Sequence, residues 1–117
     1  MKIDLIVGAR PNFIKAFPVF NKLQENSDFT VRLINTGQHY DSNMVDVFFS
    51  QLKMKNPDIN FEVGSGSHAN QTAQILIKSE KVFLKNRTDL VIVFGDVNST
   101  IAAALAAAKL HIPVAHV

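Results

Sequence analysis

The feature that most constrains the fold is an alternation of short apolar runs with stretches of helical period. Ile3 to Val7, Thr30 to Asn35 and Asp89 to Phe94 are almost continuous apolar runs of strand length, and Ile112 to Val117 is a fourth. Such runs are typical of strands that are covered on both faces. Between Thr30 to Asn35 and the later runs, a polar and apolar alternation around 59–63 predicts a short, less buried strand.

The stretches between the apolar runs predict helices. Two sets of apolar residues have the spacing of one helical face, and they are Val45, Phe48, Phe49 and Leu52 in the first stretch and Ala73, Leu76, Ile77 and Leu84 in the second. The segment from Ile101 to Leu110 is rich in alanine, which favours a helix that lies close to a sheet. Strands and helices in alternation predict an α/β fold, a Rossmann-like parallel sheet with flanking helices and right-handed crossovers.

Pro18 conflicts with a regular first helix. A proline this deep in a helix that begins at Pro11 removes a hydrogen bond and crowds the carbonyl of Ile14. Two alternatives follow: the helix kinks at Pro18, or residues 11–15 form a separate turn and the regular helix starts near Pro18.

The composition limits the class of protein. The chain has 117 residues, the length of about one domain, and no cysteine, which fits a cytoplasmic protein. Its net charge is only +2, and its lysines and arginines are scattered among acids, so we expect no nucleic-acid partner. No apolar stretch approaches the roughly 20 residues of a membrane span, and we expect neither an export signal nor a membrane partner. The four histidines lack metal-ligand spacing, so no metal site is expected.

The segment after the first strand is a candidate anion site. Gly8 introduces a turn, and a helix then opens with Arg10 and Lys15, with no acidic residue between Asp4 and Glu25. The N-terminus of a helix favours anions, and these two cations would add formal charge for a phosphate. The alternative is a plain tight turn with a proline at the first helical position.

Asp96 is the candidate acid or base. It follows the apolar strand that ends at Phe94, so its carboxylate leaves a buried element for the loops where ligands bind in parallel sheets. Such a placement suits proton transfer. The alternative is that Asp96 accepts N–H bonds in the turn while Asn98 or Ser99 caps the next helix.

A glycine-rich segment, 64–69, fits the G-x-G-x-x-A pattern of dinucleotide-binding folds. The strand before it is weak, and the acid that ends the next strand, Asp96, comes too late for the ribose. We therefore interpret the segment as a flexible lead-in to a helix, not as a nicotinamide or flavin site.

Taken together, the loops resemble the non-hydrolysing UDP-N-acetylglucosamine 2-epimerases. The motifs that carry the resemblance are Gly8-Ala9-Arg10-Pro11 with Lys15, Thr36-Gly37-Gln38-His39, Gly64-Ser65-Gly66 through Gln71-Thr72, Gly95-Asp96 with Asn98-Ser99-Thr100, and Ile112-Pro113-Val114-Ala115-His116-Val117. The resemblance covers the whole chain. It implies that the chain is part of the N-terminal domain of a GT-B fold. It also implies an isomerase that interconverts UDP-N-acetylglucosamine and UDP-N-acetylmannosamine by elimination and re-addition of UDP. The role implied for this isomerase is in cell-envelope polysaccharide synthesis.

The resemblance also implies roles for particular residues. Arg10, Lys15 and Asp96 would bind the UDP-sugar and act in catalysis, the cations on the departing diphosphate and Asp96 on a proton. Gln38, His39 and Gln71 match positions that bind a second UDP-N-acetylglucosamine as an activator in bacterial members. No metal or redox cofactor is implied, and family members commonly form homodimers.

The sequence departs from the family pattern at several positions. Ala9 and Val97 stand where threonine is common, Asn70 stands where some members have arginine, and Asp41 where glutamine is frequent. Family members continue after His-Val with Glu-Ala-Gly-Leu-Arg, whose glutamate is catalytic, and then add a second domain. We therefore expect residues 1–117 to form a single incomplete N-terminal domain, without the C-terminal domain and inactive alone. Alternatives are a domain of a GT-B glycosyltransferase or hydrolysing epimerase, and a non-catalytic sugar-nucleotide-binding module.

Overall fold

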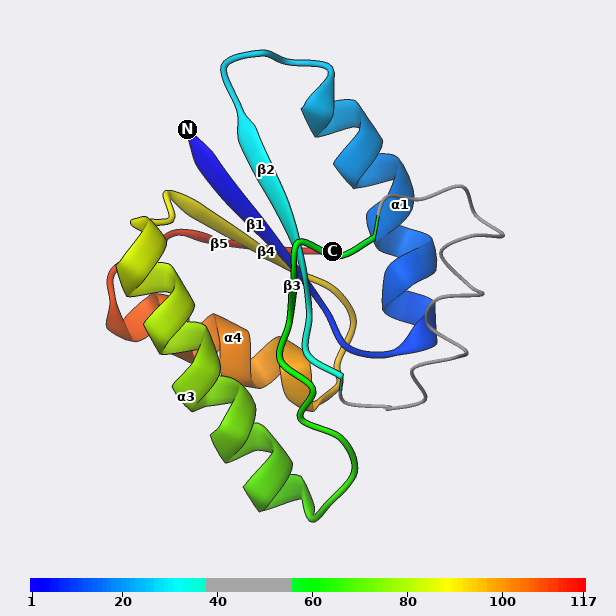
Figure 1. Ribbon diagram of the computed structural model, residues 1–117, viewed down its shortest axis with the longest axis vertical. Helices are drawn as coiled ribbons and strands as arrows, with labels where there is room; N and C mark the ends of the chain where they lie inside the picture. Colours follow the sequence, from blue (N-terminus) through cyan, green and yellow to red (C-terminus); the bar gives the residue numbers. More distant parts are fainter. Residues whose placement is uncertain (38–55) are drawn as a thin grey trace.

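The computed structural model describes residues 1–37 and 56–117, and of Arg10 and Pro11 it describes the backbone alone. Five parallel strands form one sheet in this part of the chain (Figure 1). They are β1 (Lys2–Val7), β2 (Thr30–Asn35), β3 (Ile59–Asn60), β4 (Leu90–Val93) and β5 (Val114–His116). Their order is β3-β2-β1-β4-β5, and each neighbouring pair is parallel. The predicted strands and the α/β fold class are confirmed.

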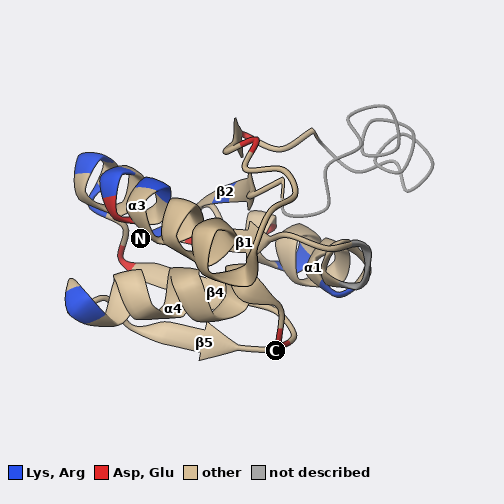
Figure 2. Ribbon diagram, turned by 90° about the horizontal axis from the view of Figure 1, so that it is seen from below, with Lys and Arg blue, Asp and Glu red and all other residues tan. Residues whose placement is uncertain are grey.

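Helices cover both faces of the sheet. Helix α1 (Arg10–Gln24) lies on one face, while α3 (His68–Asn86) and α4 (Asn98–Lys109) lie together on the other (Figure 2). The side chains of β1 alternate between the two cores, because successive residues of a strand point to opposite faces. Leu5 packs with Phe13 and Phe20 of α1, whereas Ile6 belongs to the core that includes Ala103 of α4. The helix predicted from Val45 to Leu52 lies outside the described residues.

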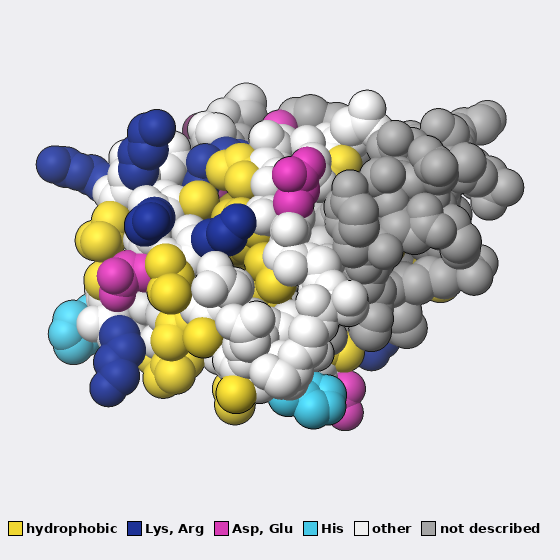
Figure 3. Space-filling model, turned by 60° about the horizontal axis from the view of Figure 1, so that its bottom comes forward, with side chains coloured by type: hydrophobic (Ala, Val, Ile, Leu, Met, Phe, Trp, Pro, Cys, Tyr) yellow, Lys and Arg dark blue, Asp and Glu magenta, His cyan; other side chains and the backbone are white. Residues whose placement is uncertain are grey.

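The buried face of α3 differs from the prediction. Ile77 and Leu84 are 48% and 58% exposed. The buried residues of the helix are Gln71, Ile75, Ser79 and Phe83. Apolar spacing missed this face because two of its four positions are polar. Figure 3 shows hydrophobic side chains interspersed with Lys and Arg on one face of the molecule.

Helix α1 runs without interruption from Arg10 to Gln24, with Pro18 inside it. The alternative in which residues 11–15 form a separate turn is therefore wrong. Ile14 and Pro18 are both exposed. The carbonyl of Ile14, which receives no N–H bond from the proline four residues later, lies on the solvent side where water can bond to it.

The amino end of the sheet contains a buried charge. Asp4 lies within β1 and is fully buried, and Arg32 of β2 donates to its two carboxylate oxygens at 2.8 Å each. The Thr88 hydroxyl donates a third hydrogen bond, of 2.6 Å, to Oδ2. Three hydrogen bonds, two of them from one bidentate guanidinium, replace the water that this carboxylate loses on folding.

Candidate active site

The strand order places a topological switch point between the loops that follow β1 and β4. These two strands are adjacent, and their helices lie on opposite faces of the sheet, so the chain leaves the sheet in opposite directions at this point. Such a topological switch point, beyond the carboxyl ends of the strands, is where ligands bind in open parallel sheets. The loop after β1 leads into Arg10, and the loop after β4 carries Asp96.

Three segments of the chain meet at Gly8. A Cβ atom at Gly8 would overlap Ser99 and would lie 2.8 Å from Thr36 Oγ1. The two hydroxyls are themselves hydrogen-bonded, with 2.7 Å between Thr36 Oγ1 and Ser99 Oγ. The loops after β1 and β2 and the first turn of α4 therefore pack in direct contact, and only a residue without a side chain fits at their centre.

Asn12 changes the interpretation of the anion site. Its buried side-chain oxygen accepts hydrogen bonds from the N–H groups of Gly8 at 3.1 Å and Ala9 at 3.2 Å. These two donors at the start of α1 are thus occupied within the protein. Anion binding at this helix would depend on the groups beyond them, chiefly the two cations.

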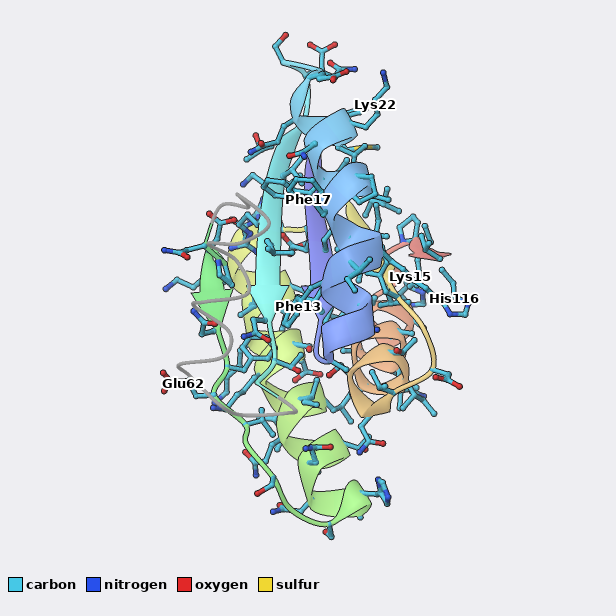
Figure 4. All side chains as sticks on the ribbon, turned by 90° about the vertical axis from the view of Figure 1, so that its right-hand side faces the viewer. Phe13, Lys15, Phe17, Lys22, Glu62 and His116 are labelled. Atoms are coloured by element: carbon cyan, nitrogen blue, oxygen red, sulfur yellow. The ribbon has the colours of Figure 1, made fainter. Side chains whose placement is uncertain are left out.

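The structure describes the side chain of Lys15 but not that of Arg10. Lys15 is exposed on α1, and in Figure 4 its side chain lies on the same side of the helix as His116, away from Glu62. Within residues 1–37 and 56–117, Lys15 takes part in no ion pair. The side chain of Arg10 lies outside what the structure describes.

Asp96 is exposed beside the end of β5. It follows Gly95, whose φ of 71° places it in the left-handed region that favours glycine. Asp96 and His116 both line a hollow of about 390 Å³, together with apolar side chains that include Val93 and Val114. Among the described residues the Asp96 carboxylate accepts no hydrogen bond, so the alternative in which it accepts N–H bonds within the turn is not supported.

Helix α4 is capped by a residue inside it. The Thr100 hydroxyl accepts the N–H of Val97, the N-cap, at 3.2 Å and donates to the Phe94 carbonyl at 2.7 Å. The alternative in which Asn98 or Ser99 caps this helix is therefore wrong, because the helix begins at Asn98 itself.

Gln71 connects the loop after β3 to the start of α4. Its side chain is 8% exposed, its Nε2 donates to the Gly64 carbonyl at 2.8 Å, and its Oε1 accepts from Asn98 Nδ2 at 2.7 Å. Asn98 Nδ2 also lies 3.1 Å from Nδ1 of His68. Of the three predicted activator-binding residues, Gln71 thus holds neighbouring loops together, whereas Gln38 and His39 lie outside the described residues.

Sequence reasoning missed three contacts at this edge of the sheet. They are the Asn12 bonds to the first turn, the Thr36 to Ser99 hydroxyl pair, and a contact of 2.7 Å between His116 Nε2 and the Gly95 carbonyl. The sequence signal that could have indicated these contacts is the position of the polar residues, each of which follows or ends a predicted strand or lies in the first turn of a helix. The described part of the chain holds no cluster of three metal-ligating side chains and no helix long and apolar enough to cross a membrane.

The parallel sheet and its topological switch point define a Rossmann-like α/β unit of the kind that binds nucleotides at the carboxyl edge of its sheet. A profile of the UDP-N-acetylglucosamine 2-epimerase family matches residues 21–117. The chain belongs to this family.

Individual relatives resemble the whole chain. It is 51% identical over 117 residues to a UDP-N-acetylglucosamine 2-epimerase homolog of Methanococcus maripaludis, and 45% identical to the UDP-2,3-diacetamido-2,3-dideoxy-D-glucuronate 2-epimerase of Pseudomonas aeruginosa. The crystal structure of the Methanocaldococcus jannaschii UDP-GlcNAc 2-epimerase in complex with UDP-GlcNAc and UDP superimposes with a TM-score of 0.94 at 45% identity. Each match covers all of this chain but only 32%, 33% and 32% of the respective relative, so the chain spans about a third of their length.

Proposed function

We propose that this chain forms the N-terminal wall of the cleft in a 2-epimerase that acts on a UDP-2-acetamido sugar. The observation that carries the proposal is that, in a family member, an exposed carboxylate, Asp96, follows β4 while the helix that begins with Arg10 and bears Lys15 follows the adjacent strand β1. The M. jannaschii relative was crystallised with UDP-GlcNAc and UDP, which supports a sugar nucleotide as the ligand.

The reaction needs two kinds of group. In the elimination, a base removes the C2 proton and the bond from C1 to the UDP oxygen breaks, which leaves a 2-acetamidoglucal. UDP then adds back to C1 while a proton returns to the other face of C2. We assign Arg10 and Lys15 to the diphosphate, where cations stabilise the departing charge, and Asp96 to proton transfer.

The remaining parts of the proposal concern the whole enzyme. Residues 1–117 would be a single incomplete Rossmann-like domain that needs a C-terminal domain for turnover. The whole enzyme would be a cytoplasmic homodimer that acts in cell-envelope polysaccharide synthesis. Gln38, His39 and Gln71 are proposed as an activator site. Because both polar atoms of the Gln71 amide bond within the protein, we expect Gln71 to act by holding the Gly64 loop.

A chimera tests the proposal. Residues 1–117 are joined to the remaining two thirds of the M. jannaschii relative, and the interconversion of UDP-N-acetylglucosamine and UDP-N-acetylmannosamine is followed by NMR. We expect turnover by the chimera and none by the 117-residue chain. Binding of UDP-N-acetylglucosamine by the chimera without turnover would contradict the proposal and favour a non-catalytic binding module. Turnover by the 117-residue chain would contradict the need for a second domain.

A second candidate substrate comes from the P. aeruginosa relative, named for UDP-2,3-diacetamido-2,3-dideoxy-D-glucuronate. Both substrates share the UDP group and the 2-acetamido group at the epimerised carbon, so the same proton transfer applies to either. The relevant measurement is kcat/KM for the two substrates in two chimeras, one with each relative's C-terminal part. If both chimeras prefer the same substrate, residues 1–117 select the sugar. If the preferred substrate changes with the C-terminal part, the other domain selects it.

A further inference from the structure

We infer that His116 is a positioning residue for Asp96, which acts by holding the Gly95 carbonyl. The inference rests on the proposed function for its kinetic consequence but not for its geometry. His116 is the last residue of β5, and its Nε2 lies 2.7 Å from the carbonyl oxygen of Gly95, the residue before Asp96. The contact joins two segments that are 21 positions apart in the chain.

The partner settles which ring nitrogen carries the proton. A carbonyl oxygen can only accept a hydrogen bond, so Nε2 of His116 must be the donor. In the neutral ring the proton then lies on Nε2 and leaves Nδ1 as the acceptor. Nε2 cannot serve as a base while this bond is made. A histidine next to a catalytic carboxylate usually suggests acid or base chemistry, but this bond indicates a structural task for Nε2.

The end of β5 holds Gly95 by both of its backbone groups. The Gly95 N–H donates to the Val117 carbonyl at 3.1 Å, and the Val117 N–H donates back to Val93 at 3.0 Å. His116 takes the remaining group, the Gly95 carbonyl. That carbonyl belongs to the peptide unit that joins Gly95 to Asp96, and a peptide unit is planar and rigid. Fixing its oxygen therefore also fixes the direction of the Asp96 N–H and the position of the Asp96 Cα.

Asp96 depends on this restraint more than a buried carboxylate would. Its side chain is exposed, and among the described residues no donor bonds to its carboxylate. The restraint that the described residues place on this side chain therefore comes through its main chain, which sets the Cα position and the direction of the Cα–Cβ bond beside the hollow that Asp96 shares with His116. Gly95 also lies close to Asn12, since a Cβ atom at Gly95 would lie 3.0 Å from Asn12 Nδ2. Asn12 in turn holds the loop after β1, so the loops after β1 and β4 meet at this glycine.

Three variants of His116 distinguish a role as a hydrogen-bond donor from a role in proton transfer. In glutamine, as in histidine, Nε2 is three bonds beyond Cβ, so His116→Gln retains the donor. In His116→Asn the amide nitrogen is one bond closer to Cβ and does not reach the carbonyl. His116→Ala has no side-chain donor. His111→Asn is the matched control, because His111 is an exposed histidine at the other end of β5 with a φ of 59°, which asparagine tolerates. Each variant is made in the 117-residue chain and in the chimera.

The structural measurement is NMR on the 117-residue chain. We expect the nitrogen shifts of His116 to show a proton on Nε2 in the neutral ring. We also expect the Asp96 amide resonance to move in His116→Ala and His116→Asn and to return in His116→Gln. A proton on Nδ1, or an Asp96 amide that is unmoved in His116→Ala, would overturn the inference whether or not the chimera is active.

The kinetic measurement is turnover of UDP-N-acetylglucosamine by the chimera. We expect kcat to fall about 10- to 100-fold in His116→Ala with little change in KM, because misplacement of a catalytic group by about 1 Å has effects of that size. His116→Gln should recover most of kcat and His116→Asn should not. A His116→Gln variant as slow as His116→Ala would overturn the positioning role in favour of proton transfer by the ring. An inactive unmodified chimera would contradict the proposed function instead, and the Asp96 amide would then decide the inference.

Discussion

Asp4 at the amino end of the sheet and Asp96 at the carboxyl end differ in burial and in hydrogen bonding. At the amino end, Asp4 is fully buried and receives hydrogen bonds from Arg32 and Thr88. At the carboxyl end, Asp96 follows the adjacent strand, is exposed, and accepts no hydrogen bond from the described residues. A carboxylate with all its partners inside the protein contributes to the fold, whereas one without them is available to a ligand. The proposed function places the substrate at the carboxyl end, where the exposed Asp96 follows a buried strand.

Close packing at the carboxyl end requires glycine at two positions. A Cβ atom at Gly8 would overlap Ser99, and a Cβ atom at Gly95 would lie 3.0 Å from Asn12 Nδ2. The segments that follow β1 and β4 are therefore packed closely against each other. Gly64, at the same end, has open space around it.

The largest expected loss of stability is at the amino end. Asp4→Ala leaves the partly buried guanidinium of Arg32 without its counter-charge, and we expect a loss of about 3–5 kcal/mol of unfolding free energy, measured by urea denaturation. Asp28→Asn, an exposed aspartate at the same end, is the control and should change little. A loss below about 1 kcal/mol for Asp4→Ala would show that the buried pair is not what stabilises this end.

The second prediction addresses the packed loops. Gly8→Ala places a methyl group against Ser99 and Thr36, and overpacking of this kind costs about 1–3 kcal/mol. Gly66→Ala is the matched control, since its nearest heavy atom lies 3.6 Å from the new Cβ. The same urea experiment compares the two glycines. Equal effects at both glycines would mean that the loops after β1 and β2 and the first turn of α4 can move apart without cost.

The third prediction concerns the start of α3. Ser67 is its N-cap and accepts the N–H of Asn70 at 3.1 Å. Ser67→Ala should cost about 1 kcal/mol, as loss of a helix cap does. Ser65→Ala, in the same exposed loop, should be neutral. If Ser65→Ala were as costly as Ser67→Ala, the loss would belong to the loop and not to the cap.

The smallest effect is expected on the surface. Lys22 and Glu25 form an ion pair at 3.2 Å with side chains that are 83% and 67% exposed. Lys22→Ala should therefore cost less than about 1 kcal/mol, and added salt should reduce even that. Thermal unfolding at low and high salt measures it. A loss comparable to that of Asp4→Ala would remove the distinction between buried and exposed pairs in this protein.

The strands could be predicted because burial on both faces requires nearly continuous apolar residues, as in Leu90–Val93. The position of Asp96 followed from the same rule, since the residues after a buried strand lie at the carboxyl edge. Pairings between distant residues could not be predicted. Nothing local in the sequence indicates that Thr88 bonds to Asp4, that Gln71 is buried on α3, or that His116 reaches Gly95.

The most direct test of the central claim is Asp96→Asn in the chimera, measured as kcat for UDP-N-acetylglucosamine and as incorporation of solvent deuterium at C2. If the carboxyl end of the sheet carries the proton-transfer group, kcat and deuterium incorporation fall together by about 10²- to 10⁴-fold. The same urea midpoint as the unmodified chimera would show that the fold is retained. Asp28→Asn at the opposite end is the control and leaves both rates unchanged. Unchanged turnover and exchange in Asp96→Asn would contradict the account.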